Sequence, residues 1–131
     1  MNKLDVQAAD ISNAYLNAPC RELIWIVAGQ EFGSDEGCVM KDVRLWYSLK
    51  RSGTSCHAML SQTMTDMEYT RCKADHDVWY CPAVKPNGFE YYEYVLIFVD
   101  NILNISKDTK ATVETIGTLY WLKPGSVGPP D

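Results

Sequence analysis

Two aspartates stand where short apolar segments end, and their positions suggest chemistry. Asp10 follows Val-Gln-Ala-Ala, and Asp100 directly follows the apolar run Val95–Val99. A carboxylate at the end of a buried strand is costly unless a partner neutralises it. Two such groups brought together would repel each other unless a divalent cation lay between them. That arrangement is typical of two-metal phosphoryl-transfer sites, in which carboxylates hold Mg²⁺ and substrate phosphates and water complete its coordination.

The same residues also have an ordinary structural explanation. Asp10 could cap the turn that follows it, and Asp100 with Asn101 would make a favourable hairpin turn. From the residues alone, both interpretations stay open.

The elements that must position these aspartates are hairpins and separate helices in a mixed order along the chain. This order predicts an α+β fold with an antiparallel sheet. A long aromatic and β-branched strand is expected before the turn at Asp100-Asn101, with a return strand after it. The predicted strands are 6–10, 23–28, 39–42, 78–81 (ended by Pro82), 89–99 and 102–106, and the predicted helices are 12–17, 44–50, 55–69 and 108–119. The segment 30–37 reads as a loop and 122–131 as an irregular tail.

The helix predicted over 55–69 carries an apolar stripe at helical spacing. The stripe consists of Met59, Leu60, Thr63, Met64 and Met67. Its methionines indicate core packing.

Three segments resemble the motifs of copia-type retrotransposon reverse transcriptases, in the family's order and near its spacing. Asp10–Asn17 is similar to Asp-Val-x-x-Ala-Phe/Tyr-Leu-Asn, and Phe98–Leu103 to the hairpin Tyr/Phe-Val-Asp-Asp-Ile/Leu-Leu. Trp46–Gly53 is similar to the intervening Leu-Tyr-Gly-Leu-Lys-x-Ser-Pro/Gly. Further similar segments are Glu31–Gly33, Lys73–Trp79 and Leu122–Val127. The resemblance covers nearly the whole chain and implies a single partial reverse transcriptase domain over residues 1–131, with a polymerase palm-like sheet and a catalytic hairpin.

The resemblance implies a metal site for RNA-directed DNA synthesis. Asp10 and Asp100 would be metal-binding carboxylates, assisted by the backbone carbonyl of Ile11, and two Mg²⁺ or Mn²⁺ ions are expected in an intact family member. The implied reaction is attack of a primer 3′-hydroxyl on the α-phosphate of a deoxynucleotide. The implied partners are an RNA or DNA primer-template and deoxynucleotides.

The resemblance also implies a nucleotide site. Tyr15 would lie beneath the incoming sugar and exclude a 2′-hydroxyl, although plain core packing is the alternative. Lys50 and Ser52 would lie along the nucleotide and template side, and Lys50 could equally be a solvated surface lysine.

The chain also departs from the family pattern. Asn101 replaces the second aspartate of the hairpin, so the site loses one of three expected carboxylates and its metal affinity should fall. Ser48 replaces a glycine, and Trp46 replaces a smaller apolar residue. The family's finger segments would precede Met1, and its thumb would follow Asp131. We therefore expect that the isolated chain does not polymerise DNA.

Composition restricts the class of protein. The 131 residues are 47% hydrophobic and 22% charged, which is typical of a globular domain. The net charge of −5 argues against a freestanding nucleic-acid binder.

Five scattered cysteines indicate reduced thiols, and the spacing of Cys72, His76 and Cys81 matches no zinc pattern. We expect an intracellular protein, because the sequence shows neither a signal peptide nor a membrane span.

Two alternatives to the polymerase fragment remain open at this stage. One is a non-catalytic palm module that binds a protein or a nucleic acid. The other is an unrelated small α+β domain whose motifs match by chance, in which case Asp10 and Asp100 would lie far apart.

Overall fold

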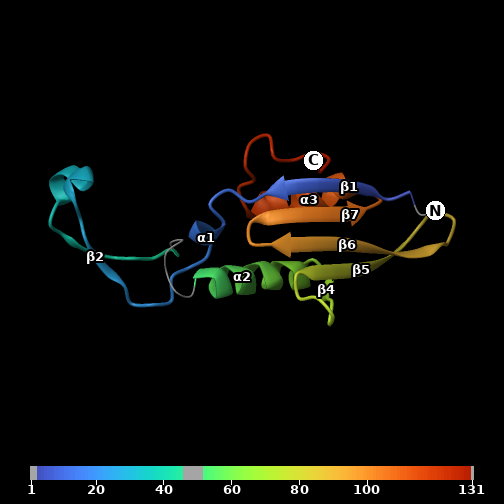
Figure 1. Ribbon diagram of the computed structural model, residues 1–131, viewed down its shortest axis with the longest axis horizontal. Coiled ribbons are helices and arrows are strands. Elements are labelled where there is room, and N and C mark those ends of the chain that lie inside the picture. Colours follow the sequence, from blue (N-terminus) through green and yellow to red (C-terminus); the bar gives the residue numbers. More distant parts are fainter. Residues whose placement is uncertain (1–2, 46–51, 131) are drawn as a thin grey trace.

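A five-stranded antiparallel sheet organises the chain in the computed structural model, which describes residues 3–45 and 52–130 (Figure 1). The sheet comprises β1 (Asp5–Asp10), β4 (Thr70–Arg71), β5 (Val78–Val84), β6 (Glu90–Phe98) and β7 (Asn101–Ser106). Their spatial order is β1-β7-β6-β5-β4. Two longer helices accompany it, α2 (Ser52–Asp66) and α3 (Thr109–Leu119). The predicted α+β class with an antiparallel sheet is confirmed.

Alternation along the strands gives the sheet one covered face. Cross-strand partners place Trp79 beside Val95 and Ile97 beside Ile102, which in turn lies beside Ala9. All five are buried, and they form one core with residues of both helices. The helical members of the core are Cys56, Leu60, Met64, Val113 and Ile116. Both helices therefore pack on the same face of the sheet.

The opposite face of the sheet is open and apolar. It carries Tyr92, Tyr94 and Phe98 of β6, whose exposed fractions are 52%, 37% and 67%. The edge-to-face pair of Tyr80 and Tyr92, with ring centroids 5.8 Å apart, lies on this side. Asp10 belongs to this face too, because Ala9 before it and Ile11 after it point into the core.

A second unit projects away from the sheet (Figure 1). The short helix α1 (Ala14–Asn17) leads to a two-stranded ribbon of β2 (Trp25–Val27) and β3 (Val39–Lys41). The connection between these strands, predicted as a loop, contains 3₁₀ turns (η1, Gln30–Asp35) interrupted at Gly33 with a φ of 57°. The loop prediction was wrong for the local backbone, because this segment forms short-range backbone hydrogen bonds, such as the one from Phe32 N to Gly29 O.

The hairpin predicted around Asp100 exists, but its turn lies one residue earlier than expected. Phe98 pairs with Asn101, so Val99 and Asp100 form the two-residue turn and Asn101 begins β7. The hairpin therefore requires Val99 to adopt a φ of 59°. A valine in this left-handed region is strained, and this is why the residue types did not predict the turn there.

Strand β5 runs past Pro82 to Val84, although the proline was expected to end it. Pro82 lies where β5 has β6 on one side only, because β4 pairs only with Trp79 and Tyr80. Its missing N–H therefore removes no hydrogen bond from the sheet.

The remaining differences concern element ends. Helix α2 begins at Ser52 and ends at Asp66, where the prediction ran to Tyr69, because Glu68 has a left-handed φ of 67°. The two-residue strand β4 was not predicted. The helix expected over 44–50 lies mostly outside the described residues, and Arg44 forms a bridge with Pro19.

The tail after α3 contains no helix or strand of its own, yet it is hydrogen bonded to β1. Leu122 bridges Ile11, and Gly128 exchanges two backbone hydrogen bonds with Ala8. The tail thus covers the edge of β1 that β7 leaves free. Within residues 3–45 and 52–130, no helix has the length and apolar character needed to cross a membrane.

Candidate metal and nucleotide site

The two aspartates singled out by sequence lie at one end of the sheet. Asp10 ends β1 and is the cross-strand partner of Asn101, the first residue of β7. The next amide along, Ile11 N, donates to the backbone oxygen of Asp100 at 2.8 Å. This backbone hydrogen bond joins the hairpin tip to the end of β1. The large separation between Asp10 and Asp100 that a chance match would have favoured is not found.

The hairpin tip is locally ordered by its own side chains. Asn101 Nδ2 donates to Asp100 Oδ1 at 3.0 Å. The strained backbone at Val99 holds Asp100 at the apex of the turn. Strain of this kind is concentrated at functional sites, where surrounding structure must hold it in place.

A lysine that the sequence did not single out lies at the site. Lys123 Nζ is 3.5 Å from Asp10 Oδ2, and Lys123 N donates to the Asp10 carbonyl at 2.8 Å. Asp10 N in turn donates to Ser126 Oγ at 3.0 Å. The tail thus brings a cation to one of the two carboxylates. In the sequence, only the resemblance of Leu122–Val127 to a reverse transcriptase segment could have pointed to Lys123.

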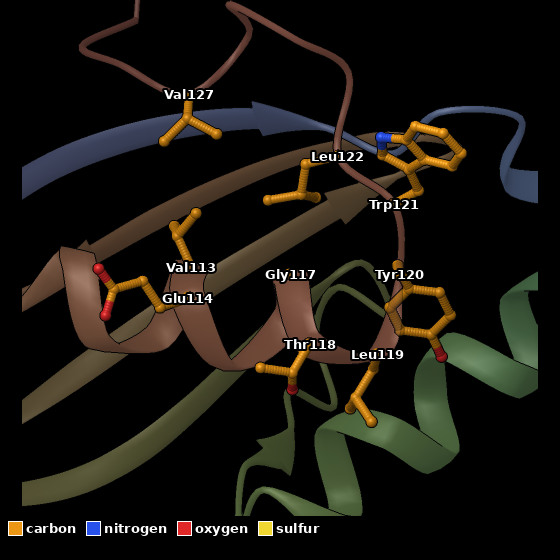
Figure 2. A pocket seen from close by; sticks show the side chains of 9 residues that line it. All are labelled: Val113, Glu114, Gly117, Thr118, Leu119, Tyr120, Trp121, Leu122 and Val127. Atoms are coloured by element: carbon orange, nitrogen blue, oxygen red, sulfur yellow. The ribbon is translucent and has the colours of Figure 1, made fainter.

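The contact of the tail with α3 explains how Lys123 reaches Asp10. Figure 2 shows the side chain of Leu122 directed toward α3 near Val113 and Gly117. A Cβ at Gly117 would lie 3.4 Å from Leu122 Cδ1, so the absence of a side chain there permits this close packing. These residues line an open pocket of about 720 Å³, with the exposed Trp121 among its lining residues.

The predicted nucleotide residues have different environments. Tyr15 lies in α1, half-buried, and packs against the core. Ser52 is the first residue of α2 and is 1% exposed, so its side chain is enclosed. Lys50 lies outside the described residues. The structure brings Tyr15 to the core, but it does not expose Ser52 to a ligand.

A groove adjoins Asp10 on the open face. Its volume is about 760 Å³, and its lining includes Asp10, Asn101 and Phe98 together with tail residues from Gly125 to Pro130. The groove is wide enough to admit a small polar molecule beside Asp10.

The donor set is smaller than a two-metal site requires. Two carboxylates with water and substrate oxygens satisfy one Mg²⁺, whereas the amide of Asn101 adds no charge where a third carboxylate is expected. Among the described residues, no group of three or more histidine, cysteine, aspartate or glutamate side chains is placed to hold a metal. The nearby ammonium of Lys123 further offsets the charge of Asp10.

Comparisons with known proteins identify no relative. No protein-family model matches the chain, and searches of curated proteins and of solved structures find no significant match.

Proposed function

We propose that this chain is a palm segment of a copia-type reverse transcriptase and that its ancestral reaction is RNA-directed DNA synthesis. The observation that supports the proposal is the adjacency of Asp10 and Asp100 at the end of an antiparallel sheet, joined by the Ile11 N to Asp100 O bond of 2.8 Å. The motif resemblance assigns the catalytic carboxylates to these same positions. Helices on one face and an open, apolar opposite face are compatible with a sheet that supports a substrate.

In this proposal Asp10 and Asp100, with the carbonyl of Ile11, would hold Mg²⁺ or Mn²⁺. When bound, such an ion stabilises charge that develops on phosphate oxygens. The chain's own residues orient the two carboxylates through the hairpin and the β1 end. Tyr15 would limit the space beneath a bound sugar. With Asn101 in place of an aspartate, we propose that the chain binds metal weakly and does not extend a primer.

The test is calorimetric titration of Mg²⁺ and Mn²⁺ into the chain and into its Asn101→Asp variant. The variant should bind at least about tenfold tighter, because a third carboxylate adds a charge-assisted contact worth more than about 1.4 kcal/mol. Asp10→Ala in the variant should abolish binding. If neither protein binds metal, or if Asp10→Ala leaves binding unchanged, the metal site is wrong.

Lys123 supplies an independent test of the same site. Lys123→Met should increase metal affinity several-fold, because the ammonium 3.5 Å from Asp10 Oδ2 opposes a cation there. Lys110→Met is the matched control, since Lys110 lies 4.0 Å from Glu114 on α3 and should leave affinity unchanged. Equal effects of the two substitutions would show a general change in charge and would count against a site at Asp10.

A second candidate function is a non-catalytic binding module. The exposed aromatic side chains of β6, namely Tyr92, Tyr94 and Phe98, favour it because they offer surfaces on which bases or apolar side chains could stack. Affinity for a primer-template that falls steeply with salt, and that Phe98→Ser weakens, would support this function.

A further inference from the structure

A cluster of polar side chains between α2 and the β4–β5 edge is separate from the two aspartates. His57 on α2 lies beside Arg71 of β4, with 3.1 Å between His57 Nε2 and Arg71 Nη2. On its other ring nitrogen, His57 Nδ1 is 3.4 Å from Ser61 Oγ. One helical turn separates His57 from Ser61, so both side chains lie on one face of α2. The three residues line a pocket of about 680 Å³.

Arg71 is held firmly but keeps unused donors. Its Nε donates to the His76 carbonyl at 2.9 Å, and its guanidinium carbon lies 5.7 Å from the ring centroid of Trp79, which is buried. These contacts fix the plane of the guanidinium. Of its five N–H groups, one serves His76 and one serves His57. The remaining three have no hydrogen-bond partner among the residues that the structure describes.

Arg71 also has no acidic partner in the described part of the chain. No described carboxylate oxygen lies within the 4.0 Å limit of an ion pair with its guanidinium. Asp77 is a charged neighbour of the cluster, and its Oδ1 lies 3.4 Å from His57 Nε2. An arginine with fixed geometry and no counter-ion is suited to bind an external oxyanion.

The imidazole of His57 lies between Arg71 and the hydroxyl of Ser61. His57 Nε2 lies 3.1 Å from Arg71 Nη2, which can only donate, and 3.4 Å from Asp77 Oδ1. Nδ1 faces Ser61, whose hydroxyl can donate as well. Thr54 and Thr70 line the same pocket and supply further hydroxyls. Donors from two elements therefore converge on one cavity in which Arg71 is the cation.

We propose that this pocket, defined by Thr54, His57, Ser61, Thr70 and Arg71, binds a phosphate oxyanion. The guanidinium of Arg71 would contact two phosphate oxygens through its free N–H groups, and the His57–Ser61 pair would contact a third. The proposal uses neither Asp10 nor Asp100, so it stands apart from the metal site. The phosphate could belong to a small phosphomonoester or to a nucleic-acid backbone, which share this chemistry.

The test is a titration of inorganic phosphate into the isotope-labelled full chain, at constant ionic strength, followed by two-dimensional NMR of backbone amides. Saturable shifts should be confined to the amides around His57, Ser61 and Arg71. Arg71→Gln should reduce the association constant at least about tenfold, because it removes the positive charge and the charge-assisted hydrogen bonds to phosphate. Arg44→Gln is the matched control, because Arg44 Nη1 donates to the Asn17 carbonyl and Arg44 is not among the described residues that line this pocket, so binding should be unchanged.

Arg71 also supports the packing of Trp79, so the glutamine variant is checked by circular dichroism. If it unfolds, His57→Gln and Ser61→Ala replace it, and each should weaken phosphate binding several-fold in a folded protein. Asp10→Ala should leave phosphate binding intact even if it abolishes metal binding, which separates this proposal from the function proposed above.

Two further ligands distinguish the source of the phosphate. Tighter binding of single-stranded oligothymidylate than of thymidine 5′-monophosphate, lost in Arg71→Gln, would identify a nucleic-acid backbone. The reverse order would identify a phosphomonoester. Absence of saturable shifts with inorganic phosphate, or equal shifts in the Arg71→Gln protein, would overturn the proposal.

Discussion

Val99 occupies a backbone conformation that its side chain opposes. At a φ of 59°, the Cβ of a non-glycine residue is crowded against the neighbouring backbone, and the cost is about 1–2 kcal/mol. The residue is kept there by the Phe98–Asn101 pairing and by the Ile11 N to Asp100 O bond on the other side of Asp100. The position of Asp100 therefore depends on contacts from two strands and not on the turn sequence alone.

Val99→Gly should raise the free energy of unfolding by about 0.5–1 kcal/mol, since glycine tolerates this φ and its greater freedom in the unfolded chain offsets part of the gain. Val84→Gly is the control, because Val84 is an exposed residue in ordinary strand conformation and its replacement should lower stability. Urea denaturation measures both. Equal destabilisation by the two substitutions would show that Val99 is not strained.

Tyr91 gives the protein a pH-dependent stability at the alkaline end. Burial, together with the hydrogen bond that its hydroxyl donates to Glu93 Oε1 at 2.8 Å, raises the pKa of Tyr91 to about 12. In the unfolded chain the phenol ionises near its ordinary value of about 10. The raised pKa means that the contribution of the neutral phenol is complete below about pH 10 and is lost as pH rises toward about 12.

The unfolding free energy of the protein should therefore fall more between about pH 9 and pH 11 than that of a Tyr91→Phe variant, which cannot ionise at this position. Tyr92→Phe, which removes an exposed hydroxyl from the same strand, should keep the slope of the parent. Urea denaturation at the two pH values gives the comparison. A slope that Tyr91→Phe leaves unaltered would contradict the assignment.

At the scale of elements, α2 is held to the sheet by a narrow stripe. Its fully buried positions are Ser52, Cys56, Leu60 and Met64, which recur every four residues. The predicted stripe contained Leu60 and Met64, and Met59 and Met67 prove to be only partly buried. The stripe is slightly rotated from the prediction because α2 contacts α1 as well as strand β4 of the sheet.

Leu60→Ala should lower the free energy of unfolding by about 2–4 kcal/mol, because Leu60 is 4% exposed and its truncation leaves a cavity in the core. Met59→Ala, one position away at the margin of the same core, should cost less than half as much. Chemical denaturation of both variants tests which face of α2 is buried. Equal losses would contradict the orientation of the helix.

The tail is the second element whose role depends on contacts distant in sequence. It pairs with Ala8 and with Asp10 along the free edge of β1. An unpaired edge strand is a template for association with other chains. Although the tail has no regular structure, it covers this edge and carries Lys123 to Asp10.

At the scale of the whole molecule, the sheet with its helices and the projecting ribbon differ in local stability. The ribbon has two short strands and leaves Trp25, Val27 and Val39 largely exposed. A two-stranded ribbon is at best marginally stable by itself. The central strand β6, by contrast, is paired on both sides and covered by the helices.

Hydrogen exchange should therefore separate the two units. The amides of Ala28 and Asp42, which donate to Cys38 O and Ile24 O in the ribbon, should exchange through local opening at a free energy well below that of global unfolding. The amides of Val95 and Ile97 should exchange only with global unfolding. Equal protection of both sets would show that the ribbon and the sheet open as one unit.

The sequence by itself determined the α+β class, most strand positions, the hairpin around Asp100 and the two long helices. These follow from alternation, helical spacing and turn chemistry, which act over a few neighbouring residues. It did not determine β4, the course of β5 past Pro82, or the turn at Val99, because strand partners from elsewhere in the chain override local preference there.

Only the tertiary structure decided which side chains meet. The pairing of β1 with β7 brings Asp10 to Asn101, and the return of the tail brings Lys123 to Asp10. The packing of α2 beside β4 places His57 against Arg71. Each of these contacts joins residues far apart in the chain, and no local pattern encodes such contacts, because they arise from the joint burial of the apolar faces of several elements.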